Sequence, residues 1–336
     1  MKEILSKLVD GNNLTKEETM HAQELILTGQ VTPAQIACFL TALRMKGETL
    51  DEITGLASVL RDKAQTIAPK VDNYVDFVGT GGDCTYSFNI STTSAFVVAA
   101  AGVPVAKHGN RSISFKSGAG DVLEALGVNI SADPQIVEKC VEEAGIGFMF
   151  APHFNPAMKY VGLVRKEMGI RTVFNILGPL SNPSRAKAMI VGVYSPKLTE
   201  VIAGTMMNLG VERGFVVSGC DNMDEFTLTG PSTVSEIKDG KVTTYEVSPE
   251  QFGLSRCKIE ELQGGVGTVN AQITKDILSG KEQGAKRDIV LLNAGAALYI
   301  GGKADSIQGG ITLAAQTIDS GKATEVLAEL VKLTNA

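Results

Sequence analysis

The sequence predicts an α/β protein with a mainly parallel central sheet and a small all-α domain at the N-terminus. Three observations support this class. Residues 1–67 show only helical patterns, from residue 71 onward short apolar strands alternate with helices, and glycine-bearing loops follow several of the strands. Alternating strands and helices are typical of a parallel sheet. A chain of 336 residues is long enough for two domains or one large one.

The N-terminal segment predicts a bundle of helices. Thr15, Thr32 and Thr49 are each followed three residues later by Glu or Gln, which is the capping-box pattern of a helix start. Gly29 and Gly47 are expected to end helices. Helical spacing of apolar residues without clustered reactive side chains predicts a structural role for this segment. A bundle this small is also a candidate for a dimer contact, because it cannot bury all its apolar faces alone.

The remainder of the chain predicts strands and helices in alternation. The elements expected in its first half are a strand at 75–78, a helix at 91–101, a strand at 103–106, helices at 118–126 and 134–144, and a strand at 147–150. The elements expected in its second half are helices at 158–168 and 172–177, a turn at 178–183, a strand at 188–193, a helix at 198–209, a strand at 214–218, β structure over 232–262 around a turn at 238–240, and helices at 288–300 and 323–333. Ligands of such sheets bind at the C-terminal ends of the strands.

Composition narrows the class of protein. The chain has 31 basic and 37 acidic residues and a net charge of −6, which argues against a nucleic-acid partner. The five cysteines show no CxxC spacing, so we expect neither a disulfide framework nor a zinc site, and a cytoplasmic location. The apolar runs are too short to span a bilayer, so no membrane partner is expected.

The first candidate site is the first loop, residues 79–83, which contains Gly79, Gly82 and Asp83. Its spacing matches neither the P-loop nor the dinucleotide fingerprint, and taken alone it also fits a tight turn without a ligand. Asn89, Ser91 and Thr92 follow at a helix start. Backbone amides and hydroxyl groups at a helix start suit a diphosphate and its metal, although an ordinary N-cap cluster is the simpler alternative.

A second loop, residues 107–112, carries Lys107, His108, Gly109, Asn110, Arg111 and Ser112 directly after a buried strand. Cation runs are usually solvated surface, but this one is expected at the ligand-bearing edge of the sheet. Lys107 is the best candidate for a phosphate-binding cation. Arg111 has two candidate roles, phosphate binding or structure. His108 is equally well explained as a packed histidine hydrogen-bonded to the backbone.

A carboxylate pair, Asp224-Glu225, follows another predicted strand. Mg²⁺ binds through one or two carboxylates together with substrate phosphates. A surface acidic pair is the alternative, and the position after a strand is what favours the metal.

Together these motifs resemble the anthranilate phosphoribosyltransferase family over essentially the whole chain. The motifs that carry the resemblance are Gly79-Thr80-Gly81-Gly82-Asp83, Asn89-Ile90-Ser91-Thr92, Lys107-His108-Gly109-Asn110-Arg111, Arg165, residues 175–180, and Asp224-Glu225. The resemblance implies a nucleoside phosphorylase/phosphoribosyltransferase-type (class III-like) fold. It implies a helical domain at 1–70 to which residues 159–186 return, an α/β domain at 71–158 and 187–336, an active-site cleft between them, and a homodimer.

The resemblance also implies the reaction and its residues. A family member transfers the phosphoribosyl group of 5-phosphoribosyl 1-pyrophosphate (PRPP) to the amine of anthranilate in tryptophan biosynthesis. Ser91, Asp224 and Glu225 would bind two Mg²⁺ ions, and Lys107, Asp224 and Glu225 would be catalytic. Gly79, Asn110 and Arg165 would contact anthranilate, with Arg165 pairing its carboxylate. The full set implied to bind substrate is Gly79, Gly82, Asp83, Ser87, Asn89, Ile90, Ser91, Thr92, Lys107, His108, Gly109, Asn110, Arg111, Ser112, Phe115, Ala119 and Arg165.

The chain departs from the family pattern at Ala119, Phe115 and Asn155, where members usually have serine, a small residue and histidine. His153 lies two residues from Asn155. These departures fall mainly on the acceptor side, so a transferase for another aromatic amine stays open. A pyrimidine nucleoside phosphorylase would need no metal pair, which Asp224-Glu225 argues against. A binding protein that keeps the fold without turnover is the alternative from another class.

Overall fold

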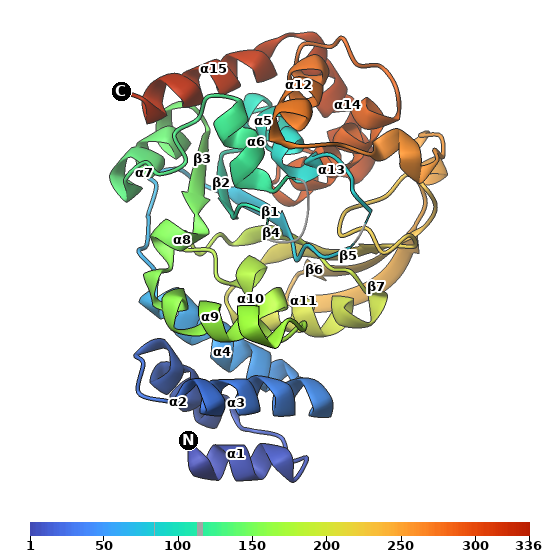
Figure 1. The fold of residues 1–336 in the computed structure, drawn as a ribbon. Helices are drawn as coiled ribbons and strands as arrows, with labels where there is room; N and C mark the ends of the chain where they lie inside the picture. The colour runs from blue at the N-terminus through green and yellow to red at the C-terminus, as the bar shows by residue number, and fades with distance from the viewer. Residues whose placement is uncertain (84, 113–116) are drawn as a thin grey trace.

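The computed structural model describes residues 1–83, 85–112 and 117–336. Its N-terminal part is helical, and Figure 1 shows it at one end of the molecule. Helices α1 (Lys2–Val9), α2 (Lys16–Leu27), α3 (Pro33–Lys46) and α4 (Leu50–Lys63) follow one another there. The three predicted capping boxes are confirmed, because Thr15, Thr32 and Thr49 each accept a hydrogen bond from the backbone three residues on. These helices begin where the sequence predicts because a side chain satisfies an otherwise unpaired N–H group.

The rest of the described chain is organised around one sheet of seven strands in the order β3-β2-β1-β4-β5-β6-β7. The first five are parallel and the last two antiparallel, which confirms the predicted α/β class. The strands are β1 (Val75–Gly79), β2 (Val105–Gly109), β3 (Ile146–Phe150), β4 (Ala188–Gly192), β5 (Arg213–Gly219), β6 (Ser232–Lys238) and β7 (Lys241–Val247).

Helices cover both faces of this sheet. The helices after β1 are α5 (Ile90–Ala100), α6 (Ala119–Ala125), α7 (Pro134–Glu143), α8 (Ala151–Phe154), α9 (Lys159–Met168), α10 (Phe174–Leu180), α11 (Thr199–Asn208), α12 (Gly267–Leu278), α13 (Ala285–Ile300), α14 (Ile307–Asp319) and α15 (Lys322–Thr334). Short 3₁₀ helices occupy Pro156–Met158, Pro196–Leu198, Pro249–Phe252 and Ile259–Leu262. In the described part of the chain, no helix combines the length and apolar character needed to cross a membrane.

Alternating residues of the central strands pack into two different cores. Ile190 of β4 belongs to the core shared with α5 and α13, whereas Met189 and Val191 belong to the core shared with helices α1–α4. Successive side chains of a strand point to opposite faces, so the sheet separates these cores. Helix α9 contacts α2 and α3, and α10 contacts α4 and β2. Segments from the middle of the chain therefore pack against the N-terminal helices.

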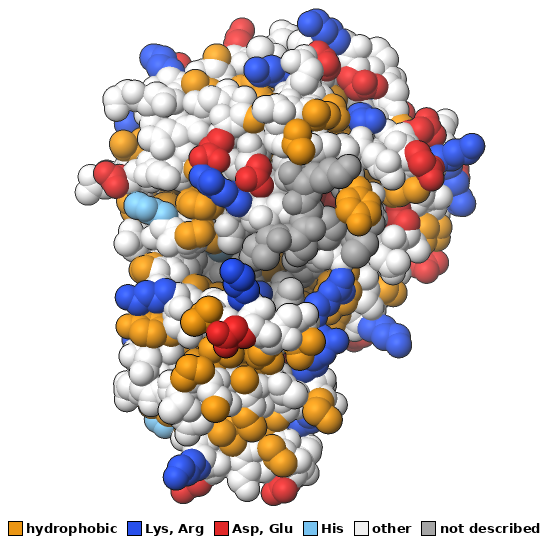
Figure 2. Space-filling model, in the orientation of Figure 1, with side chains coloured by type: hydrophobic (Ala, Val, Ile, Leu, Met, Phe, Trp, Pro, Cys, Tyr) orange, Lys and Arg blue, Asp and Glu red, His pale blue; other side chains and the backbone are white. Residues whose placement is uncertain are grey.

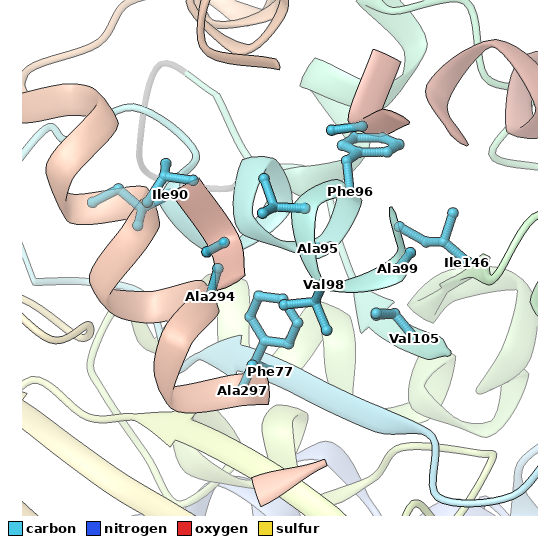
Figure 3. Packing of buried hydrophobic residues seen from close by; sticks show 14 of the residues in the cluster. Phe77, Ile90, Ala95, Phe96, Val98, Ala99, Val105, Ile146, Ala294 and Ala297 are labelled. Atoms are coloured by element: carbon cyan, nitrogen blue, oxygen red, sulfur yellow. The ribbon is translucent and has the colours of Figure 1, made fainter. Parts of the chain in front are cut away.

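The core above β1 includes alanines of α5 and α13. Figure 3 shows Phe77 pointing from β1 toward Val98 of α5 and Ala294 of α13. Ala294 and Ala297 are fully buried, and alanine at these positions allows α13 to pack closely against α5. The close packing holds the first turn of α5 at the C-terminal end of β1.

Three predicted elements differ from the structure. Strand β2 continues through Gly109, so Lys107 and His108 lie in a strand, where they pair with Phe148 and Met149 of β3. Helix α10 continues through the predicted turn because Pro179 falls in its last turn, and Ser181 closes that turn by donating to the Gly178 carbonyl.

The predicted β structure over 232–262 is a hairpin, β6 and β7, that ends at Val247. Asp239 and Gly240 make its turn with φ values of 50° and 70°, which is the geometry that suits the twist of a hairpin. Two 3₁₀ helices follow in place of further strands. The tail contains α12 and α14 in addition to the two predicted helices, and Gly267, Gly309 and Gly310 weaken the helical pattern of those segments.

Candidate active site

The loop that carries the carboxylate pair folds back over the ends of β1 and β4. A Cβ atom on Gly79 would lie 2.1 Å from Asp224 Oδ2, and one on Gly192 would lie 1.6 Å from the Asp224 carbonyl oxygen. Only glycine therefore fits at either strand end beneath Asp224. The Gly81 N–H donates to Asp224 Oδ2 at 2.7 Å. These contacts bring the first loop and Asp224 together at the point where the strand order reverses, which is the usual ligand position in such sheets.

The second carboxylate of the pair faces the start of α5. The Ser91 N–H donates to Glu225 Oε1 at 3.2 Å. The next residue, Phe226, is clamped by Asn293 of α13, which accepts from its N–H at 3.1 Å and donates to its carbonyl at 3.0 Å. Asn293 is not among the site residues predicted from the sequence, although a lone asparagine within an apolar helix is a detectable signal. These two hydrogen bonds fix the backbone next to Glu225 and so restrict the position of its side chain.

Lys107 reaches the same place from β2. Its side chain is buried, and its Nζ donates to the Phe77 carbonyl at 2.6 Å and to Ser91 Oγ at 3.3 Å. It also lies over the Phe77 ring, 5.2 Å from the centroid. The ammonium group thus joins β1, β2 and the first turn of α5, next to the Glu225 contact.

Burial makes this group of charges electrostatically strained. Burial first, and then the neighbouring carboxylates, raise the pKa of Asp224 to about 7 and that of Glu225 to about 8. Burial also raises the pKa of Asp83 and lowers the pKa of Lys107. Within residues 1–83, 85–112 and 117–336, no group of three or more His, Cys, Asp and Glu side chains is placed to hold a metal. A partly buried carboxylate pair still fits Mg²⁺, which takes its remaining oxygen ligands from phosphates and water, and a cation there would relieve the repulsion.

The residues flanking α5 are tied to the C-terminal part of the chain. Asn89 Oδ1 accepts from Asn270 Nδ2 at 2.9 Å and from Ser117 Oγ at 3.2 Å. Ser87 forms an isolated bridge with Gln263. Ile90 packs in the core, and the buried Thr92 hydroxyl has no hydrogen-bond partner among the described residues. Asn270 is not among the site residues predicted from the sequence, because nothing local to α12 signals a contact with residue 89.

The second loop is held from below by α6. Asp121 accepts from the N–H groups of Ser112 at 2.9 Å and Gly118 at 2.8 Å. Arg111 is half exposed and pairs with Glu124 at 2.6 Å, which supports its structural alternative. A Cβ on Gly109 would lie 3.3 Å from the Ala119 Cβ, so Ala119 packs directly against the end of β2.

Asn110 and Phe115 are the two other predicted site residues of this loop. The Asn110 side chain accepts from the Arg111 N–H at 2.7 Å, and its carbonyl accepts from the Gly120 N–H at 3.0 Å. Asn110 therefore shapes the turn between β2 and α6. Phe115 lies outside the described residues, so its predicted role at this site stays a prediction.

His108 is a packed histidine beside Asn155. Both side chains are buried, and His108 Nε2 lies 3.3 Å from Asn155 Nδ2. Burial lowers the pKa of His108 to about 4, so its imidazole is neutral near pH 7. The His153 ring packs edge-on against Phe154.

Two arginines approach from the helical side. Arg165 on α9 lies 5.5 Å from the centroid of the Phe174 ring, and burial lowers its pKa. Among the described residues it makes no ion pair, which leaves its charge available to an acid. Arg171, which the sequence analysis missed, donates to the Gly82 carbonyl and lies 4.2 Å from the centroid of the Tyr194 ring. Figure 2 shows Lys and Arg side chains along the boundary between the helical and α/β parts.

Comparison with known proteins gives matches along essentially the whole chain. Residues 71–324 match the α/β domain of a glycosyl transferase family, and residues 2–64 match the helical bundle domain of that family. The anthranilate phosphoribosyltransferase of Acetivibrio thermocellus is 55% identical over 336 residues, covering 100% of this chain and 97% of the relative. That of Citrifermentans bemidjiense is 52% identical, covering 100% of this chain and 99% of the relative.

Solved structures give the same result. The structure of anthranilate phosphoribosyltransferase from Thermus thermophilus has a TM-score of 0.95 and 41% identity, covering 99% of each chain. That of the Saccharomyces cerevisiae enzyme in complex with PRPP and Mg has a TM-score of 0.91 and 28% identity, covering 99% of this chain and 97% of the yeast chain.

Proposed function

The chain belongs to the anthranilate phosphoribosyltransferase family, and we propose that the meeting point of the first loop, α5 and Asp224-Glu225 is its catalytic site. The observation that carries the proposal is the set of three contacts Gly81–Asp224, Ser91–Glu225 and Lys107–Ser91. They converge on amides, an ammonium group and two carboxylates at one edge of the sheet. This donor set suits a metal-bound pyrophosphate.

The reaction is a displacement at C1 of the ribose. The nitrogen lone pair of anthranilate forms the new C1–N bond, the C1–O bond to pyrophosphate breaks, and pyrophosphate leaves with that electron pair. The amine gives up one proton to solvent. An aromatic amine is uncharged near pH 7, so the site needs to orient two substrates and stabilise the leaving group more than it needs a strong base.

The residues of this chain divide these tasks. We assign the first-loop amides, Ser91 and Lys107 to the pyrophosphate of PRPP. Asp224, Glu225 and the Ser91 hydroxyl would hold Mg²⁺, which neutralises charge on the leaving pyrophosphate when bound. Two ions are proposed because Asp224 faces the first loop and Glu225 faces α5. The yeast relative, whose structure contains PRPP and Mg, supports the choice of metal.

Arg165 is proposed to pair with the carboxylate of anthranilate. Replacing it with alanine should raise the KM for anthranilate about ten- to a hundredfold while the KM for PRPP changes little, because a charge-assisted pair is lost on the acceptor side alone. Steady-state kinetics with each substrate varied would measure this. The matched control is Lys166→Ala, an exposed cation on the same helix. A rise confined to the KM for PRPP would show that Arg165 serves the donor.

The function itself is tested by incubating the protein with PRPP, Mg²⁺ and anthranilate. We expect the fluorescence of anthranilate to fall and one pyrophosphate to be released per anthranilate consumed. Binding of PRPP without turnover would contradict catalysis. Phosphate-dependent cleavage of a pyrimidine nucleoside by the same sample would indicate the phosphorylase alternative.

We also propose that the protein is a homodimer that associates through its helical part and acts in the cytoplasm. Val9, Met45 and Leu163, on α1, α3 and α9, are 68%, 83% and 64% exposed. Figure 2 separately shows hydrophobic side chains across the lower, helical part of the molecule. Analytical ultracentrifugation should give twice the mass of one chain, and a monomer at micromolar concentration would contradict the dimer.

The free cysteines of the described chain suit a reducing compartment, and recovery outside the cytoplasm in cell fractionation would contradict the location.

A further inference from the structure

The sheet is incompletely paired directly beneath the candidate site. Strands β1 and β4 pair along five residues, as do β2 and β3. Strands β1 and β2 pair only at Val75 and Val105, although both continue to the glycines at their ends. In a regular parallel ladder the next hydrogen bonds would join the N–H and C=O groups of Phe77 to Ala106 and His108. The described structure replaces those bonds with others.

Side chains supply the hydrogen-bond partners of these backbone groups. The Phe77 carbonyl accepts from Lys107 Nζ at 2.6 Å, and the Ala106 carbonyl accepts from Asn182 Nδ2 at 3.0 Å. The His108 N–H donates to Asp76 Oδ1 at 3.3 Å. Asn182 Nδ2 also donates to Asp76 Oδ2 at 2.6 Å. One carboxylate and one amide, both fully buried, thus occupy the place of the ladder between β1 and β2.

The orientation of Asn182 is determined by its other contacts. Its Oδ1 accepts from the N–H and from the hydroxyl of Ser184, both at 2.7 Å. Two donors on one side of the amide require oxygen there, so Nδ2 must point toward the sheet. The segment after α10 therefore supplies a pre-oriented donor for Asp76.

A buried carboxylate is an expensive way to satisfy backbone groups that could pair with each other. Burial raises the pKa of Asp76 to about 6, while Lys107, Asn182 and the backbone of His108 and Phe77 oppose the rise. Removing a charge from water is unfavourable even when the charge is paired. Ordinary ladder bonds would satisfy the same groups without that penalty, which indicates a role beyond stability.

We propose that Asp76 and Asn182 are positioning residues that end the pairing of β1 with β2 and so let the Lys107 ammonium lie between the strands beside Ser91. Neither residue lies among the groups assigned to the substrates. Asp76 contacts the His108 backbone directly. Both residues affect the Lys107 ammonium indirectly, by ending the pairing of β1 with β2. The proposal rests on the proposed function only in assigning Lys107 to the pyrophosphate of PRPP.

The main test compares Asp76→Asn with Glu52→Gln. Glu52 is an equally buried carboxylate that accepts from Leu14 and Lys46 within the helical part, so its variant controls for the loss of a buried charge. Asp76→Asn should lower kcat/KM for PRPP about ten- to a hundredfold, with little change in the KM for anthranilate. This range is typical of residues that do not touch a ligand themselves but orient a group that does. Glu52→Gln should reduce stability and leave both values unchanged. Equal kinetic behaviour of the two variants would overturn the proposal.

A spectroscopic measurement reports the geometry independently of activity. The chain has three histidines, so ¹⁵N-histidine labelling gives three backbone amide signals, one from His108. Asp76→Asn should move that signal upfield, because its N–H then donates to an amide oxygen in place of a carboxylate. Glu52→Gln should leave it in place. An unmoved signal in Asp76→Asn would contradict the contact. If that variant does not fold, Asn182→Ala takes its place in the kinetic comparison with the same expected loss in kcat/KM for PRPP, because it removes the donor to Asp76 and to the Ala106 carbonyl.

Lys107→Met, assayed alongside, separates this proposal from the assignment of Lys107. If Lys107→Met uses PRPP normally, the assignment fails, and the His108 signal still decides the contact. If Lys107→Met is impaired and Asp76→Asn is not, the positioning role fails.

Discussion

Replacing Asp224 with asparagine and Glu225 with glutamine is expected to lower Mg²⁺-dependent kcat by about a thousandfold or more. Both carboxylates are partly buried and turned toward the loop and helix that are proposed to bind pyrophosphate. Their amides would not hold Mg²⁺, so the charge of the leaving pyrophosphate would not be neutralised by the metal. Loss of a single preorganised charge-stabilising group typically costs about 10²–10³ in kcat, and this change removes two. Initial rates over a range of Mg²⁺ concentrations would measure the effect.

The matched control for this double variant is Glu260→Gln with Glu261→Gln. These two carboxylates are also adjacent, but both are exposed. The control should keep the Mg²⁺ dependence of the parent. Near-parent turnover by the Asp224/Glu225 variant would remove these residues from the metal site.

Lys107→Met is expected to have the next largest effect, a loss of about a hundred- to a thousandfold in kcat/KM for PRPP. Methionine fills much of the same volume but supplies no charge and no N–H donor. The ammonium group donates to Ser91 Oγ and interacts electrostatically with Asp224 and Glu225. Its loss therefore removes the side-chain cation that is proposed to lie nearest the leaving group. The KM for anthranilate should change far less. Steady-state kinetics, together with calorimetric titration of pyrophosphate and Mg²⁺, would measure both.

The control for Lys107 is Lys187→Met. Lys187 is exposed and lies just before β4, so its variant removes one charge from the same sheet at the end away from the site. It should behave as the parent. A Lys107→Met protein with weakened use of anthranilate and normal use of PRPP would reverse the assignment of this lysine.

The convergence of the loops was predictable because it follows from strand direction. Gly79, Ser91 and Asp224 each come after a predicted strand, and parallel strands bring their C-terminal ends to one edge. No distance between these loops was needed to expect them together. The contacts of Gly81 with Asp224 and of Ser91 with Glu225 bear out that expectation of proximity.

The supporting residues were not predictable because their partners are remote in the sequence. Asn182 meets Asp76 across 106 positions, and Asn270 meets Asn89 across 181. Nothing near either asparagine indicates which group it satisfies. The sequence predicts Lys107 in a loop for a related reason. A charged residue usually ends a buried strand, and the acceptor of Lys107, the Phe77 carbonyl, lies on a different strand. Buried polar groups of this kind are identified only when the fold is known.

A crystal structure of the protein with PRPP and Mg²⁺ tests the central claim most directly. We expect the pyrophosphate within hydrogen-bonding distance of the first-loop amides, Ser91 and Lys107, with Mg²⁺ between it and the carboxylates of Asp224 and Glu225. A pyrophosphate bound elsewhere, with Gly82, Ser91 and Glu225 out of reach, would contradict the assignment of this site.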